Sequence, residues 1–168
     1  MILPENECPE FFIPLLQLVE EDFLAELIHQ LETYTQFIQE IPQEKQLYKY
    51  AENKWTVKEV VGHSTDTERI KSTVALRIAR NDKAPLPSFN EDEFVLATDF
   101  NSREMSDLID EFIAVRKSTI AFAKSLNDEE LKRIGTASGK NVSTRALLYF
   151  LVGHIRHHEN ILKERYGV

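Results

Sequence analysis

Apolar residues recur at three- and four-residue steps along much of this 168-residue chain, the spacing that places them on one face of an α-helix. The first such stretch predicts a helix over residues 20–40. Its apolar face consists of Leu24, Leu27, Ile28, Leu31, Thr35 and Ile38. A second helix is predicted over residues 56–80, because Thr56 and Glu59 form a T-x-x-E capping box at the start of the next apolar stripe.

Two more long helices are predicted in the second half of the chain. The third begins near Asn101 or Ser102, where acidic residues are enriched, and runs to about Leu126. The fourth follows Ser143, whose hydroxyl can cap a helix, and runs to about Arg165. None of the four stretches contains a proline, which favours long uninterrupted helices.

The segment between the third and fourth helices is predicted to hold a short helical turn over residues 128–132 and a loop over residues 134–142, which includes two glycines, a serine and an asparagine. The chain shows no alternating strand pattern of useful length and no internal repeat. We therefore predict an all-α fold that forms a single domain over residues 1–168.

The connection between the second and third helices predicts the topology. About twenty residues join them, including Pro85, Pro87 and Phe89, whereas antiparallel neighbours are usually joined by only a few residues. A crossover of this length allows the third helix to run parallel to the second. We expect a four-helix bundle with up-down-down-up topology.

Composition and charge exclude several classes of protein. The formal net charge is −8, and the basic residues Arg77, Arg80 and Lys83 are followed closely by the acidic run at 91–93, so nucleic acid is not an expected partner. We expect neither secretion nor membrane spanning, because the first residues lack the pattern of a signal peptide and no apolar stretch is long enough to span a membrane. The single cysteine, Cys8, suits a reducing compartment, so we expect a cytoplasmic protein.

Three of the five histidines are predicted to face one another inside the bundle. His154 and His158 lie one turn apart in the apolar stripe of the fourth helix, and two imidazoles at this spacing can bind one ion. His63 lies on the predicted buried face of the second helix. Imidazole nitrogen suits zinc, nickel, copper or iron, and three protein ligands leave one coordination position open for water or substrate.

Other interpretations of the histidines stay open. A single histidine on an apolar face is more often a hydrogen-bonded core residue than a ligand, so the three can be purely structural. Their joint burial favours metal, because three neutral imidazoles in a core need partners. His29 and His157 are expected to face solvent or the edge of the site.

The remaining candidate groups carry weaker signals. Asp66 and Glu68 project to different sides of the second helix, which favours surface charge over a paired-carboxylate acid–base site. Cys8 has no basic cluster nearby to lower its pKa, which favours an inert thiol. Gly62 and Gly153 each precede a histidine of the predicted site, and either close helix packing or room beside a metal explains them.

The second helix, the crossover and the last helix carry short motifs in a specific order. They are K-W-T-V-K-E-V (54–60) leading into G-H (62–63), D-T-E-R (66–69), L-R-I-A-R (76–80), L-P-S-F-N-E-D (86–92) and G-H-I-R-H-H (153–158). In this combination the chain resembles the DinB-like superfamily of bacterial metal-binding four-helix bundles, and the resemblance covers most of its length.

The resemblance implies that His63, His154 and His158 bind one divalent metal ion, with zinc and nickel the expected ions. The most similar branch includes metal-dependent hydrolases and thiol transferases, some of which join bacillithiol to an electrophile, while others isomerise maleylpyruvate with mycothiol. The chain departs from this branch at Ser88, where glycine is usual, and at Ser64-Thr65, which replace a more apolar pair.

The leading hypothesis is a metal-dependent enzyme that acts on a small molecule. The ion would lower the pKa of a bound thiol or water, which gives a thiol S-transferase or a hydrolase, and the resemblance favours S-transfer. No general base is identified, and Trp55 and Phe89 are candidate pocket residues. The alternative is a non-catalytic module that binds metal or a ligand and acts through a partner or a homodimer interface.

Overall fold

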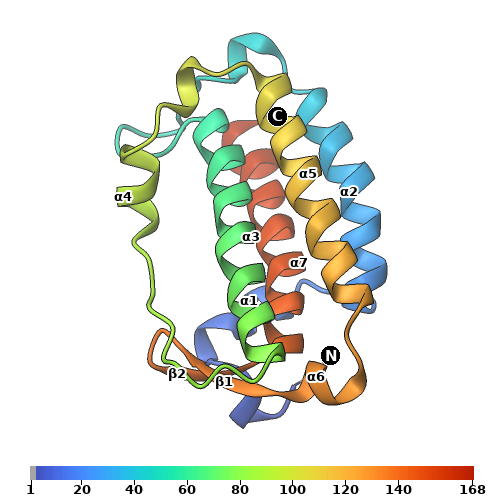
Figure 1. The fold of residues 1–168 in the computed structure, drawn as a ribbon. Coiled ribbons are helices and arrows are strands. Elements are labelled where there is room, and N and C mark those ends of the chain that lie inside the picture. Colours follow the sequence, from blue (N-terminus) through green and yellow to red (C-terminus); the bar gives the residue numbers. More distant parts are fainter. Residues whose placement is uncertain (1–2) are drawn as a thin grey trace.

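The computed structural model describes residues 3–168 and confirms the predicted four-helix bundle (Figure 1). The long helices are α2 (Phe23–Gln39), α3 (Val57–Ala79), α5 (Met105–Lys124) and α7 (Thr144–Ile161). In Figure 1, α2 and α7 run from the bottom of the bundle to the top, and α3 and α5 run from the top to the bottom. The topology is therefore up-down-down-up, as the length of the crossover predicts.

Each long helix packs against two others. α3 lies against α5 and α7, and α2 lies against the same two helices, so α2 and α3 are diagonal to each other. Because α3 and α7 are antiparallel neighbours, the N-terminal half of α3 lies beside the C-terminal half of α7. This arrangement brings residue 63 opposite residues 154–158.

Shorter elements surround the bundle (Figure 1). They are α1 (Ile13–Leu16), α4 (Glu91–Leu96), α6 (Asp128–Lys132), β1 (Ile134–Ala137), β2 (Lys140–Ser143) and the single turns Glu5–Glu7, Glu10–Phe12, Gln43–Lys45, Phe100–Ser102 and Leu162–Tyr166. The short helix predicted over residues 128–132 is confirmed as α6. Among the helices of residues 3–168, none combines the length and the apolar character needed to cross a membrane.

The predicted caps of α3 and α7 are present. Thr56 Oγ1 accepts a hydrogen bond from the Glu59 amide at 3.1 Å, and the Glu59 carboxylate accepts one from the Thr56 amide at 2.7 Å. These two bonds form the complete capping box. At the start of α7, Ser143 Oγ accepts a hydrogen bond from the Ala146 amide. Side-chain caps therefore begin both helices that carry the predicted site.

The predicted start of the third helix is wrong by a few residues, because α5 begins at Met105 rather than at Asn101 or Ser102. Asp99 accepts a hydrogen bond from the Ser102 amide and closes a separate single turn there. Arg103 then adopts an extended conformation (φ −82°, ψ 149°), which separates that turn from α5.

The predicted loop over residues 134–142 is instead an antiparallel β-hairpin, which corrects the expectation of no strands. Ile134 pairs with Ser143 at its open end, and Ser138 (φ 52°) and Gly139 (φ 72°) form its tight turn. Four-residue strands are too short to show a clear alternation in the sequence. The hairpin is held by a long-range contact, since Leu86 of the crossover exchanges backbone hydrogen bonds with it.

The buried face of α2 also differs from the predicted one. The periodicity predicts that Ile28 is buried, but it is 45% exposed, whereas Glu26 and Gln30 are each 3% exposed. Partners from α7 allow this burial, because Arg156 donates to Glu26 at 2.8 Å and Gln30 donates to the Val152 carbonyl at 3.0 Å. Polar pairing across the helices therefore overrides the simple apolar stripe.

Glu68 of α3 lies inside the bundle rather than on its surface, which corrects the prediction for this residue. Its carboxylate is 2.8 Å from Arg116 of α5, and the two side chains are 1% and 0% exposed. Arg116 also donates a hydrogen bond to Gln30 Oε1 of α2 at 3.0 Å. The ion pair joins α3 to α5, and the hydrogen bond to Gln30 adds α2, so this cluster ties three helices together.

The two glycines beside the predicted ligands mark close approaches of the chain. A Cβ on Gly62 would lie 2.3 Å from the ring of Phe100, and a Cβ on Gly153 would lie 2.2 Å from the carbonyl oxygen of Leu15. Close packing rather than room beside a metal therefore explains both glycines. The contacts hold the crossover against α3 and the N-terminal segment against α7.

Candidate metal centre

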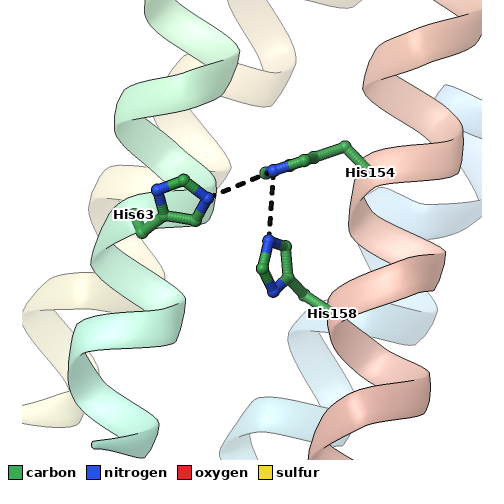
Figure 2. A group of neighbouring side chains, drawn as sticks. All are labelled: His63, His154 and His158. Carbon is green, nitrogen blue, oxygen red and sulfur yellow. Dashed lines mark hydrogen bonds between the residues drawn. The ribbon is translucent and has the colours of Figure 1, made fainter. Parts of the chain in front are cut away.

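The three predicted histidines meet between α3 and α7. Figure 2 shows His63 on one helix facing His154 and His158 on the other, with the three rings converging. The Nε2 atom of His154 lies 3.2 Å from Nε2 of His63 and 3.1 Å from Nε2 of His158. The spacing of four residues places His154 and His158 on one face of α7, and the antiparallel packing supplies His63.

Burial keeps the three imidazoles neutral. It lowers the pKa of His63 to about 4, and His63 is only 2% exposed. Burial, together with the neighbouring imidazoles, also holds the pKa values of His154 and His158 well below the usual value. At neutral pH each ring therefore has one nitrogen lone pair available to a cation.

The donor set fits a divalent transition metal. One ligand nitrogen from each residue lies within 4.8 Å of the other two. Two nitrogens bound to a tetrahedral zinc ion at roughly 2.0–2.1 Å are about 3.4 Å apart, which is close to the 3.1 and 3.2 Å contacts found here. Among the side chains that the structure describes, those of residues 3–4 and 6–168, no other group of three histidine, cysteine or acidic residues is this compact.

Hydrogen bonds among the rings leave the cluster incompletely satisfied. Both short contacts use the same atom, Nε2 of His154, and a neutral imidazole has only one hydrogen to donate. Within the described part of the chain, the buried Nδ1 atom of His158 has no hydrogen-bond partner. A cation at the common centre would use the lone pairs that the rings cannot share with one another.

Aromatic side chains surround the ligands. The Trp55 ring lies 4.6 Å from the His63 ring, measured between centroids, and Phe150 stacks on His154 at 5.5 Å. Trp55, predicted as a pocket residue, thus contacts the candidate centre directly. This packing keeps His63 and His154 in place and excludes water from one side of each ring.

Two cavities reach the histidines from different sides. The larger has a volume of about 530 Å³. Its walls include Phe12, Lys71, Phe89, Glu91, Phe150 and His154. The smaller, of about 280 Å³, is lined by Trp55, Asp92, His158 and Tyr166 among others. Phe89 therefore lies in the wall of the larger cavity, as expected. His158 belongs to both cavities, so the centre is accessible to a small molecule.

The other predicted residues lie outside the cluster. His29 of α2 is exposed, and His157 is exposed on α7 at the rim of the larger cavity. Cys8 is buried, and burial raises the pKa of its thiol, which agrees with an inert cysteine. Asp66 lies 3.6 Å from Arg69 on the same helix and forms no acid–base pair with Glu68.

Three charged residues near the centre were missed by sequence reasoning. Lys71 lies about two helical turns after His63 on α3, so the helical period contained a signal for it. Glu91 and Asp92 come from α4 in the crossover, and each lines one of the two cavities. Their position depends on how the crossover folds back onto α3, which no local periodicity encodes.

A sequence model of the DinB superfamily matches residues 26–162, a span that includes all three histidines. The chain belongs to the DinB superfamily. No curated protein sequence matches it.

Two solved structures share the DinB-type bundle. YfiT from Bacillus subtilis, described as a probable metal-dependent hydrolase with an unusual four-helix bundle topology, is 18% identical, with a TM-score of 0.71 over 99% of this chain and 94% of YfiT. The mycothiol-dependent maleylpyruvate isomerase is 11% identical, with a TM-score of 0.69 over 87% of this chain and 61% of the isomerase. At these identities the likeness establishes the fold alone.

Proposed function

We propose that this DinB-superfamily chain is a metal-dependent enzyme in which His63, His154 and His158 hold one divalent transition metal, zinc or nickel. The observation that carries the proposal is the convergence of three buried, neutral imidazoles beside a cavity. A divalent ion in such a site lowers the pKa of a thiol or water bound to it and so supplies a nucleophile at neutral pH.

The protein side chains would perform three tasks. The imidazoles bind without adding negative charge, because burial keeps them unprotonated and no carboxylate belongs to the set. Trp55 and Phe150 pack on two of the imidazole rings and hold them in position. The larger cavity, about 530 Å³, has the size of a small-molecule site and is walled in part by phenylalanines.

We propose thiol S-transfer as the reaction, with hydrolysis as the second candidate. The thiol would lose its proton to solvent, its sulfur would bond to an electrophilic carbon, and the leaving group would depart with the electrons of the broken bond. Among proteins of similar fold, one is described as a mycothiol-dependent isomerase and one as a probable metal-dependent hydrolase, so thiol-dependent and hydrolytic chemistry are both attributed to this fold.

Metal analysis of protein purified without a polyhistidine tag tests the ligand set. The wild type is expected to carry about one ion per chain, as a single three-histidine site would. A variant with His63→Ala and His154→Ala is expected to carry none. His157→Ala is the matched control, because His157 lies on the same helix but is exposed, and this variant should retain the metal. Equal metal content in the wild type and the double variant would refute the ligand assignment.

The reaction is tested with metal-loaded protein, bacillithiol and the electrophile monobromobimane, with the fluorescent adduct as readout. The wild type should exceed the uncatalysed rate, and His158→Ala should return to it. His29→Ala, which changes an exposed histidine on α2 away from both cavities, should stay close to the wild type. Hydrolysis of a generic ester by the wild type without thiol consumption would favour the second candidate. Uncatalysed rates in every assay would indicate a binding module.

A further inference from the structure

The ammonium group of Lys71 stands in the wall of the larger cavity and has no role in holding the metal. Its position on α3, about two turns after His63, directs it into the cavity that His154 and His158 also line. The side chain is partly buried, and burial lowers the pKa of this amine. A buried cation needs a compensating partner, and the candidates around Lys71 are few.

Three aromatic rings surround the Lys71 amine without satisfying it. Its Nζ atom lies 5.5 Å from the ring centroids of Phe89 and Phe150 and 6.0 Å from that of Phe12. These separations are near the outer limit of cation–π attraction, about 6 Å, so each contributes little. The rings leave the three N–H donors of the ammonium free to point into the cavity.

Among the residues whose side chains the structure describes, 3–4 and 6–168, no carboxylate comes within the 4.0 Å of an ion pair with Lys71. The other partly or fully buried cations have polar partners: Lys58 donates hydrogen bonds to the backbone carbonyls of Asn101 and Arg103, and Lys45 donates one to the carbonyl of Tyr166. Arg116, Arg145 and Arg156 each lie 2.8 Å or less from a carboxylate oxygen. Glu91 lines the same cavity and attracts Lys71 across it, but the two groups make no direct contact.

We propose that the larger cavity binds a small organic carboxylate, with its carboxylate on Lys71 and its carbon skeleton against Phe12, Phe89 and Phe150. The opposite end of the ligand would face His154 and His158, and this last part rests on the proposed function. Lys71 is thus assigned as the residue that selects anionic substrates. A cavity of about 530 Å³ has room for such a molecule.

The first experiment needs no metal. The affinities of 3-phenylpropanoate and of the uncharged 3-phenylpropanamide are measured by calorimetry on metal-free protein. We expect the wild type to prefer the carboxylate by roughly tenfold or more, the usual effect of a charge-assisted hydrogen bond. Lys71→Met keeps the apolar length of the side chain and should abolish the preference, whereas Lys71→Arg should retain it.

Lys117→Met is the matched control, because Lys117 is an exposed lysine on α5, and this variant should behave as the wild type. Glu91→Gln removes the competing negative charge and should tighten carboxylate binding several-fold. The proposal is overturned if the wild type does not bind 3-phenylpropanoate, if it binds acid and amide equally, or if Lys71→Met keeps the preference.

A second experiment separates this inference from the metal-dependent function. Cobalt-loaded wild type and Lys71→Met are titrated with 3-mercaptopropanoate and 3-mercaptopropanamide, and the sulfur-to-cobalt absorption band reports binding at the histidines. Both proteins should bind the amide, and only the wild type should favour the acid. Failure to take up cobalt in either protein would count against the metal centre, while a carboxylate preference in the metal-free protein would still support Lys71.

Discussion

One buried polar cluster of the bundle lies around Arg116 between α2, α3 and α5, and another lies at the histidines between α3 and α7. The charges of the first cluster cancel internally, since Arg116 pairs with Glu68 and also donates to Gln30. The second contains three neutral rings whose nitrogens converge and share one contact atom. It also borders two cavities, whereas Arg116 and Glu68 line neither of them.

The contrast between these two clusters indicates how a structural polar cluster can be distinguished from a candidate functional one. Burial alone does not separate them, because both sets of side chains are nearly inaccessible to solvent. Charge pairing and access to a cavity do. A cluster whose opposite charges pair with each other and that lines neither cavity stabilises one arrangement of helices, whereas converging imidazole nitrogens beside a cavity are the arrangement that the proposed metal would require.

Breaking the ion pair is expected to have the largest effect. Arg116→Met leaves the Glu68 carboxylate uncompensated in the core, which should lower the free energy of unfolding by about 3–5 kcal/mol. Chemical denaturation measures this loss. Adding Glu68→Leu to the same chain should recover most of it, since the stranded charge is then gone. A loss below about 1 kcal/mol, the value for exposed pairs such as Arg69–Glu111, would contradict a structural role.

Metal binding should stabilise the second cluster and leave the first unchanged. Zinc at about one hundred times its dissociation constant should raise the free energy of unfolding of the wild type by about 2.7 kcal/mol. His154→Ala removes the ligand that contacts both other histidines and should abolish the gain. Thermal melts with and without zinc provide the measurement. An equal zinc-induced shift in His154→Ala would show that the ion binds elsewhere.

The close contact between α7 and the N-terminal segment, next to His154, can be disrupted without substituting any of the three histidines. Gly153→Ala would place a methyl group against the Leu15 carbonyl, so the N-terminal segment must move away from α7. We expect a loss of about 1–3 kcal/mol in unfolding free energy. An alanine at the exposed Asn160 of the same helix is the matched control. A stabilised Gly153→Ala protein would show that this contact is loose.

The free energy of unfolding of the metal-free protein should depend on pH, and the change per pH unit should be the smallest of these effects. The folded-state pKa of His63, about 4, lies below its usual value of 6.5, so the unfolded chain binds more protons between these values. The free energy of unfolding therefore reaches its maximum above about pH 6.5. It falls between pH 6.5 and pH 4, by roughly 1 kcal/mol per pH unit for each such histidine. Urea denaturation with a chelator present tests this. His63→Leu should show a shallower slope, and an unchanged slope would argue against a neutral buried His63.

Much of the fold and the convergence of the three candidate ligands could be predicted from the sequence. The capping box at Thr56 and Glu59 placed the start of α3, and the i, i+4 spacing of His154 and His158 placed both on one face of α7. These signals are local, because they depend on backbone groups and side chains within one or two helical turns. The prolines and the long crossover also predicted the correct topology.

Other features depended on contacts between distant segments. Glu26, Gln30 and Glu68 look like surface residues in a helical pattern, and only their partners on other helices make their burial possible. The β-hairpin forms around Leu86 of the crossover, and its strands are too short to be recognised alone. In each case the deciding hydrogen bond joins residues far apart in the chain.

The sequence by itself therefore determined the four helices, their caps and the three histidines, because these follow from periodicity and local hydrogen bonding. Only the tertiary structure decided which polar residues are buried and what surrounds the histidines. Lys71 is an example. It lies on the same helix as His63, but the rings around its amine belong to Phe12, Phe89 and Phe150, which come from three other segments. Such a setting depends on how those segments pack, and no local pattern encodes it.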